Sequence, residues 1–326
     1  MKKLICLILA LSIISIYNLN YFDEVKDFIS EKLINEKINE NNILDTSKIK
    51  KFEYIKIGDS KELVIDYIGS PDRIDSSEYD FSWYVYNSYK ESFAMVGIEN
   101  SIVVALFSNN INSCEGEEIY INKDIYYIRE NFETLDYRDK GSVKYKITSN
   151  DEYDIIYKNN KYITVFYDKF EDDKIWAYEI IEKSTEDKNM EIYPSENKNI
   201  EESYMYQIID LINSTRYKNN LNPLKYNEKA SKSAKKHSQD MKKNNYFNHT
   251  NLNDKTPFDR MENEGINYRI AGENIAAGQI NAIYEHNGLM NSAGHRKNIL
   301  GNYKYIGVGV IFGGKYKTYY TENFFG

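Results

Sequence analysis

The chain has 326 residues, of which 28% are charged and 41% are hydrophobic. This composition excludes a disordered polymer, and the length exceeds that of one ordinary core, so two domains with connecting segments are expected. The net charge of -8 is unevenly spread: residues 1–200 hold 25 Lys and Arg against 38 Asp and Glu, whereas residues 201–326 hold 17 against 12. No nucleic-acid-binding motif accompanies the basic part, which argues against nucleic acid as a partner.

The first 20 residues are typical of an export signal. Lys2 and Lys3 precede an almost wholly apolar run over residues 4–17, which is shorter than a comfortable membrane-spanning helix. Because no small-x-small cleavage pattern follows, we favour an uncleaved signal anchor, with a cleaved signal peptide as the alternative. Either one predicts an extracellular or cell-surface protein. Cys114 is the single cysteine beyond this segment, so no internal disulfide is expected there.

Residues 21–50 are charged and compatible with a helix, and we interpret them as a stalk or spacer. A folded region is expected over 51–182. Its first part combines a capped helix after Ser60, ended by Gly69 and Pro71, with strands at 82–86, 94–98 and 102–107. The same order recurs as a helix over 125–132 and strands at 143–147, 154–158, 162–167 and 174–181. Two similar α+β units are therefore predicted, followed by a polar linker over 183–201.

This doubled arrangement resembles the CAP-associated N-terminal domain of exported bacterial proteins. The likeness rests on the Ile-Gly-Asp-Ser sequence at 57–60, the Gly-Ser-Pro sequence at 69–71 and the Trp-Tyr-Val-Tyr strand at 83–86. We find no catalytic constellation in this region and interpret it as a support or interaction module.

The last part of the chain, residues 202–326, predicts helices followed by a hairpin. Helices are expected over 202–217, after Asn227, and from Thr256, which begins a capping-box sequence, to Gly265. A strand is expected near 269–276, and two more, 305–312 and 316–325, flank Gly313 and Gly314. These elements indicate a sheet covered by helices on its faces.

Five segments of this region, in this order, resemble the CAP (cysteine-rich secretory protein, antigen 5, pathogenesis-related 1) superfamily, and most closely its bacterial SCP-like branch. They are residues 246–249, 256–260, 272–276, 290–300 and 305–309. The resemblance implies an α/β/α sandwich, and for the whole chain an α+β fold class. It also implies a central cleft that holds a His, Glu, Glu, His tetrad able to bind a divalent cation.

On this resemblance, His249 and His295 match the two histidines and Glu273 matches the glutamate of the Gly-Glu-Asn motif. The remaining glutamate position is Ser292 here. We name the cleft residues as His249, Glu273, Asn274, Ser292, His295 and Arg296.

Two imidazoles and one carboxylate, His249, His295 and Glu273, suit Zn²⁺ or another divalent cation, although no cofactor follows with certainty. An alternative is a buried hydrogen-bonded network without metal. A Ser292-His295-Glu273 hydrolase is a further reading, but Ser292 is better explained as a helix N-cap. Among the other histidines, His237 is expected in the core and His286 facing solvent.

These observations favour a non-enzymatic binding module over an enzyme. Its partners would be a glycan, lipid or protein of the cell envelope, and the membrane through the N-terminal segment. The alternatives are a metal-assisted hydrolase that uses His249, His295 and Glu273, and a structural envelope or spore-coat protein.

Overall fold

The structure is a computed structural model that describes residues 52–87, 93–109 and 119–326. The expected signal segment, the stalk over 21–50 and Cys114 lie outside the described residues. Within the described ranges, none of the helices combines the length and the apolar character needed to cross a membrane.

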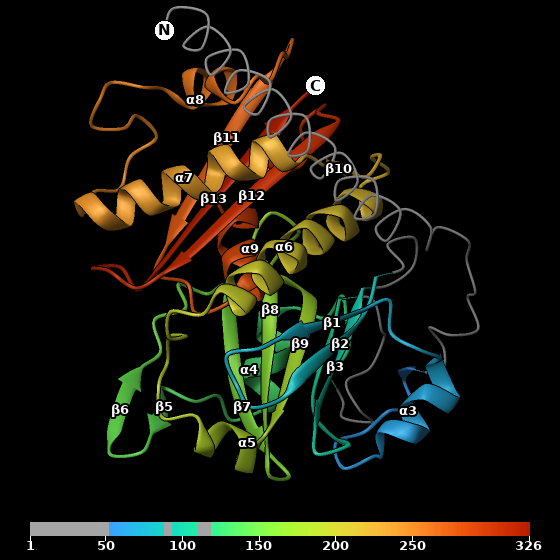
Figure 1. Ribbon diagram of the computed structural model, residues 1–326. Coiled ribbons are helices and arrows are strands. Elements are labelled where there is room, and N and C mark those ends of the chain that lie inside the picture. The colour runs from blue at the N-terminus through green and yellow to red at the C-terminus, as the bar shows by residue number, and fades with distance from the viewer. Residues whose placement is uncertain (1–51, 88–92, 110–118) are drawn as a thin grey trace, which may run out of the picture.

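The first half of the chain builds a seven-stranded antiparallel sheet from two units (Figure 1). The first unit comprises α3 (Lys61–Ile68), β1 (Arg73–Ser76), β2 (Ser82–Tyr86), β3 (Ala94–Glu99) and β4 (Ile102–Ser108). The second comprises α4 (Ile125–Asn131), the separate hairpin β5 (Tyr137–Lys140) and β6 (Val143–Lys146), then β7 (Tyr153–Lys158), β8 (Lys161–Asp168) and β9 (Lys174–Glu182). The strand order is β1-β2-β3-β4-β9-β8-β7, so the antiparallel pair β4 and β9 joins the two units.

Local sequence signals explain why the two units are alike. Ser60 caps α3 by accepting from the backbone N–H of Leu63, and Asp124 caps α4 by accepting from that of Tyr127. The tight turns between β3 and β4 and between β7 and β8 each place two non-glycine residues at positive φ, which is the geometry of a type I′ hairpin. The prediction of two similar helix-plus-strand units is confirmed.

The two faces of this sheet pack against different parts of the molecule. On one face, Val64 and Ile68 of α3 and Ile125 and Ile128 of α4 pack against the strands. On the other face, apolar side chains of the sheet share one continuous core with two helices of the C-terminal half. They include Trp83, Phe107 and Phe166 of the sheet and Tyr204, Ile208 and Tyr284 of the helices.

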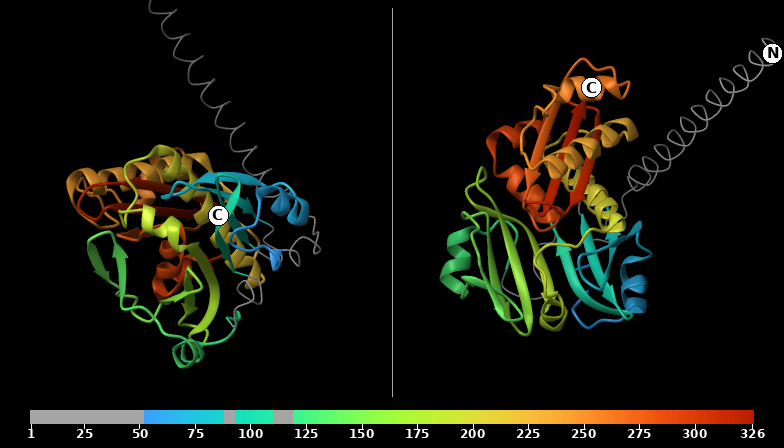
Figure 2. Two further views of the ribbon diagram at one scale, coloured as in Figure 1. Left: turned by 90° about the horizontal axis from the view of Figure 1, so that it is seen from below. Right: turned by 60° about the vertical axis from the view of Figure 1, so that its left-hand side comes forward.

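The C-terminal half is a four-stranded sheet between helices, which confirms the predicted α/β/α sandwich. Its elements are α6 (Lys198–Lys218), β10 (Lys225–Tyr226), α7 (Glu228–Asn244), α8 (Pro257–Asn263), β11 (Ala271–Ala277), α9 (Ala282–Met290), α10 (Ala293–Ile299), β12 (Tyr305–Phe312) and β13 (Thr318–Phe325). The strand order is β10-β12-β13-β11. Helices α6 and α9 lie between this sheet and the N-terminal sheet, whereas α7 crosses the far face (Figures 1 and 2).

Two glycines of β12 allow α7 to lie directly on the sheet. A Cβ atom added to Gly307 would come within 2.1 Å of the backbone nitrogen of Ser231, and one added to Gly309 would come within 2.1 Å of that of Lys235. No side chain fits in that space, so glycine sets the approach of the helix. The same helix carries His237 and borders the candidate site.

Some elements differ from those expected. Strands β1 and β5 were not anticipated. Within the expected linker, residues 183–188 form helix α5 (Lys183–Lys188), and α6 already begins at Lys198. Helix α5 is held by long-range ion pairs, because the buried Glu186 contacts Arg138 at 2.6 Å and Lys140 at 2.7 Å. Such pairs are not visible in a local sequence window.

Candidate functional site

Strand β11 supplies the central side chains of the site. Glu273 and Asn274 are consecutive in this strand, so their side chains point to opposite faces of the sheet. Glu273 faces the segment that carries His249 and Arg260, whereas Asn274 faces Glu322 and α10. The two residues, both predicted for the cleft, therefore have different roles.

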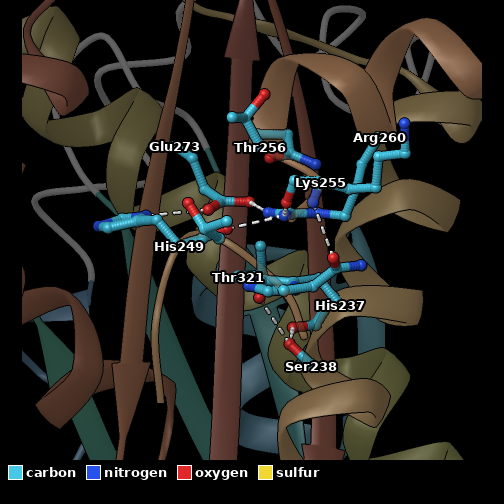
Figure 3. Close-up of polar contacts among 12 residues, drawn as sticks. His237, Ser238, His249, Lys255, Thr256, Arg260, Glu273 and Thr321 are labelled. Atoms are coloured by element: carbon cyan, nitrogen blue, oxygen red, sulfur yellow. Dashed lines mark hydrogen bonds and ion pairs between the residues drawn. The ribbon is translucent and has the colours of Figure 1, made fainter. Parts of the chain in front are cut away.

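Glu273 joins His249 and Arg260 into one cluster (Figure 3). Its Oε1 lies 2.9 Å from Nδ1 of His249, and its Oε2 accepts a hydrogen bond from Nη2 of Arg260 at 2.6 Å. The Glu273 side chain is 1% exposed and that of Arg260 is 10% exposed, whereas that of His249 is 47% exposed. A buried carboxylate thus has a partner on each oxygen, and the imidazole is fixed with one edge in solvent. We refer to these three residues as the His249 cluster.

Arg260 also fixes the loop that carries His249. It lies on the short helix α8, which begins at the Thr256 capping box expected from the sequence. Its Nη1 donates to the backbone oxygens of His249 and Lys255 at 2.7 and 2.9 Å. One guanidinium therefore holds both the backbone and, through Glu273, the ring of His249.

His295 and Ser292 form a second contact beside the cluster. Ser292 is the N-cap residue of α10, as expected, but its Oγ makes no capping hydrogen bond and lies 2.9 Å from Nδ1 of His295. Burial lowers the pKa of His295, and the neighbouring His249 lowers it further. The fold therefore brings the two predicted histidines near each other, each ring oriented through Nδ1 by a different partner.

Asn274 supports this arrangement from the other side of the sheet. Its Nδ2 donates to Oε2 of Glu322 at 2.9 Å and to the backbone oxygen of His295 at 3.3 Å. Asn298 completes the link, donating to Oδ1 of Asn274 at 2.9 Å and to the backbone oxygen of Glu273 at 3.2 Å. Helix α10 is thereby fastened to β11, and Asn274 positions His295 through its backbone.

Arg296 lies outside the group that converges on Glu273. Its Nη1 donates to both carboxylate oxygens of Asp168 in β8, at 2.8 and 2.9 Å, and its guanidinium lies 5.1 Å from the ring centroid of Phe170. Among the predicted cleft residues, Arg296 is therefore the one that the structure places at the boundary with the N-terminal domain.

The remaining two histidines are both buried. His237 is 1% exposed, as expected, with Nε2 3.0 Å from the backbone oxygen of Asn248, and burial lowers its pKa to about 4. His286, which we expected to face solvent, is wholly buried, and that expectation is wrong. Helix α9 is enclosed between the two sheets, which buries His286, and its Nε2 lies 2.9 Å from Thr215 Oγ1.

The His249 cluster does not suit Glu273 as a ligand of a divalent cation. Both carboxylate oxygens are engaged, and the guanidinium at 2.6 Å already supplies the positive charge that a metal would bring. In the part of the chain that the structure describes, no group of three or more His, Cys, Asp and Glu side chains is arranged to hold a metal ion. A catalytic zinc site normally uses three protein ligands, whereas two imidazoles remain here.

The geometry also fails to assemble the Ser-His-Glu arrangement. The carboxylate of Glu273 pairs with His249, while the serine contacts His295. A triad needs the carboxylate and the serine on opposite nitrogens of the same imidazole.

Arg260 is the site residue that our sequence reasoning missed. It ends a segment that we used for the resemblance, but we gave it no role. One signal was available: Glu273 is a charged side chain within the otherwise uncharged strand Ala271–Ala277 and, once buried, requires a cation. The sequence does not say which of the nearby cations fills that role.

An α/β/α sandwich with a histidine and glutamate cluster, built onto a doubled α+β sheet, defines the class as a two-domain protein of CAP type. Two family profiles match the chain accordingly: CAP-associated N-terminal over residues 57–192, and Cysteine-rich secretory protein family (CAP) over residues 209–324.

Among individual proteins, the uncharacterized membrane protein YlbC of Bacillus subtilis (strain 168) is 31% identical over 291 residues, covering 82% of each chain. The uncharacterized protein YkwD of the same organism is 45% identical over 125 residues, which cover 38% of this chain and 48% of YkwD. The chain therefore belongs to the same family as YlbC, and in this chain a CAP-associated N-terminal domain precedes a CAP domain.

Solved structures agree with this assignment. An extracellular protein containing an SCP domain from Bacillus anthracis str. Ames has a TM-score of 0.70 and 27% identity, over 82% of this chain and 93% of its own. A cysteine-rich secretory protein from Staphylococcus aureus subsp. aureus Mu50 has a TM-score of 0.66, over 82% of this chain and 91% of its own. At 15% identity, this likeness shows the fold alone.

Proposed function

We propose that this protein is an exported binding module, tethered to the cell surface or secreted, whose CAP domain binds a ligand of the cell envelope through the His249 cluster and His295. The proposal rests on the contacts of Glu273, whose two carboxylate oxygens each contact a different side chain. Its buried carboxylate holds His249 and Arg260 in place, so His249 presents a fixed, half-exposed ring, and both oxygens of Glu273 are engaged rather than free to act as a general base.

Exposed apolar side chains border the cluster and favour a ligand with both polar and apolar parts. Phe247 and Phe258 are each 43% exposed and Leu252 is 63% exposed, and all three belong to the loop and helix that carry His249 and Arg260. Large apolar side chains exposed around a fixed polar group are a common feature of binding surfaces.

Two further observations support export. Lys2, Lys3 and the apolar run after them are typical of a signal segment. In addition, the relative YlbC is described as a membrane protein, and the similar protein from Bacillus anthracis as extracellular.

A cosedimentation experiment tests the proposal. The full chain, kept in mild detergent so that its apolar N-terminal segment is not the binding element, is mixed with purified cell-wall sacculi. The wild type is compared with the double variant His249→Gln and His295→Gln, with Leu252→Ser, and with the control Asn253→Ala, which changes an exposed residue of the same loop.

We expect the wild type and the control to cosediment and the other two variants to lose most of the bound fraction. Equal binding by all four proteins contradicts the proposal. Release of soluble sugar fragments by the wild type, but not by the double variant, would establish the hydrolase alternative instead. Calorimetry with Zn²⁺ tests the metal alternative, because a binding heat that is lost in the double variant supports a site on the two imidazoles.

A further inference from the structure

A line of lysines runs along the outer side of helix α7, on the face of the CAP sheet that lies away from the N-terminal sheet (Figures 1 and 2). Lys229, Lys232, Lys236 and Lys243 are all exposed, and at 3.6 residues per turn they lie within about 60° of one another around the helix axis. We call these four residues the α7 lysine row. From its first to its last lysine the row is about 21 Å long, at 1.5 Å per residue.

Neighbouring carboxylates neutralise only part of the charge of this row. Glu264, which follows α8, contacts Lys232 at 3.4 Å and Lys236 at 2.5 Å, so one carboxylate serves two lysines. Lys229 and Lys243 make no ion pair with any residue that the structure describes. The α7 lysine row therefore keeps a net positive charge.

Further carboxylates border the row where α6 begins. Lys235 and Lys242, which lie next to the row on the helix, pair with Glu201 at 3.4 Å and with Glu196 at 2.8 Å. The Glu196 side chain is 67% exposed. The unbalanced positive charge is thus confined to a narrow line with acidic groups beside it.

The narrowness of this line determines the shape of the partner that it fits. A flat anionic surface such as a bilayer would also meet the bordering carboxylates, because charges within a Debye length of about 10 Å are not screened. It would in addition meet a chain whose net charge is -8. A single linear polyanion can follow the row and avoid both sources of repulsion.

We propose that the α7 lysine row binds a linear phosphodiester polymer that carries no bases. Lysine binds phosphate as a point charge, and lysines on neighbouring turns are about 5 Å apart along the axis, a spacing that phosphates joined by a short polyol can match. The row contains no aromatic side chain on which a base could stack, which separates this ligand from single-stranded nucleic acid. None of its residues belongs to the His249 cluster, so this is a second site.

The test measures the binding of a fluorescently labelled synthetic poly(glycerol phosphate) to the full chain, kept in mild detergent, over a series of NaCl concentrations. The row variant combines Lys229→Gln with Lys243→Gln. Its matched control combines Lys297→Gln with Lys304→Gln, which removes the same charge from two exposed lysines outside α7. Glu264→Gln is a variant of opposite expectation, because it releases two lysines of the row.

We expect log K for the polymer to fall with log salt concentration at a slope of about -3, because each of four contacted phosphates contributes about -0.7 through counterion release. The row variant should bind about tenfold more weakly and with a shallower slope, while its control binds like the wild type. Glu264→Gln should bind about threefold more tightly. Equal affinities of the row variant and its control overturn the proposal, as does weaker binding by Glu264→Gln in a protein that keeps its melting temperature.

Two competitors test the linear, base-free character of the ligand. Glycerol 3-phosphate at the same phosphate concentration should not displace the polymer, because a row of separate contacts gains its affinity only from linked charges. Single-stranded oligothymidylate with the same number of phosphates should bind no more tightly than the polymer. Displacement by the monomer, or tighter binding of the oligothymidylate, contradicts the proposed ligand.

Anionic vesicles test the membrane as the rival partner. The wild type and the row variant should bind equally to vesicles of phosphatidylglycerol and phosphatidylcholine in equal parts. Weaker vesicle binding by the row variant, together with unchanged polymer binding, would assign the row to a membrane and overturn the proposal.

This inference and the proposed function fail separately. The His249→Gln and His295→Gln double variant should bind poly(glycerol phosphate) like the wild type, because neither residue belongs to the α7 lysine row. If polymer binding does not depend on the row while sacculus binding depends on the two histidines, only the inference about α7 falls.

Discussion

Arg260 Nη2 lies 2.6 Å from Glu273 Oε2, and the side chains of the two residues are 10% and 1% exposed. A carboxylate that is this deeply buried depends on its cation, because removing one partner of a buried pair leaves an uncompensated charge. The pair therefore contributes to both the stability of the CAP domain and the placement of His249.

Replacing the cation of this pair should destabilise the protein. Arg260→Met keeps much of the length of the side chain but removes its charge and its hydrogen bonds to the backbone of His249 and Lys255. We expect a loss of about 3 kcal/mol in the free energy of unfolding, measured by urea denaturation. Adding Glu273→Gln to this variant should recover part of the loss. Arg269→Met, at an exposed position, is the control, and an equal effect of the two single variants contradicts this account.

The stability of the protein should fall towards alkaline pH. Glu285 is wholly buried with no hydrogen-bond partner for either oxygen in the described part of the chain, and the equally buried Glu322 is hydrogen-bonded to Asn274 through one oxygen. Burial raises the pKa of both carboxyl groups, and the proximity of Glu322 raises that of Glu285 further. In the N-terminal domain, burial likewise raises the pKa of Glu179 to about 8.

A carboxyl group with a raised folded-state pKa stabilises the folded protein below its unfolded-state pKa, near 4.5. This stabilisation is lost as the pH rises through the folded-state value, at up to about 1.4 kcal/mol per pH unit for each group. We therefore expect the melting temperature to decrease from pH 7 to pH 9, and Glu285→Gln to make this decrease shallower. A melting temperature that rises over this range would refute the assignment of protonated buried carboxyls.

The ion pair between Arg296 and Asp168 should contribute to the joining of the two domains. Both side chains are largely buried, at 12% and 15% exposure. Asp168→Asn should lower the free energy of unfolding by about 2 kcal/mol, in the range of hydrogen bonds to charged groups. Asp172→Asn, on a side chain that is 92% exposed, should have no measurable effect. Calorimetric melting of both variants provides the test, and equal shifts would argue against a role for this pair.

Two glycines should respond in opposite ways to the same substitution. Gly307→Ala places a methyl group 2.1 Å from the Ser231 backbone nitrogen, so α7 must move and we expect a loss of at least about 3 kcal/mol. Gly294→Ala adds a methyl group in open space within α10 and should stabilise the protein by about 0.5–1 kcal/mol. Chemical denaturation of both variants checks the pair. A mild effect at Gly307 would mean that α7 is not seated against β12 as described.

Local sequence signals predicted much of the fold. The capping box at Thr256 depends on neighbouring residues only, and it occurs where it was expected. The burial of His237 followed from the spacing of apolar residues on its helix. Features that depend on tertiary packing were missed. His286 is preceded and followed by polar residues, yet it is buried because α9 lies between two sheets.

The sequence predicted the main residues of the candidate site but not the hydrogen bonds and ion pairs that link them. The resemblance identified His249, Glu273 and His295, and the fold brings them into one region. The hydrogen bond between Arg260 and Glu273 joins residues 13 positions apart in the chain. The hydrogen bonds between Arg296 and Asp168 join residues 128 positions apart. No local pattern encodes such pairings.

The continuous core between the N-terminal sheet and helices α6 and α9 limits how this architecture can be rearranged. If the CAP domain were separated from the N-terminal domain, Tyr284 and the neighbouring apolar side chains would be exposed to solvent. The isolated CAP domain would then tend to self-associate. CAP domains that occur alone should therefore carry polar residues at these positions. Chimaeras between family members should fold well only when the sheet face and the two helices are inherited together.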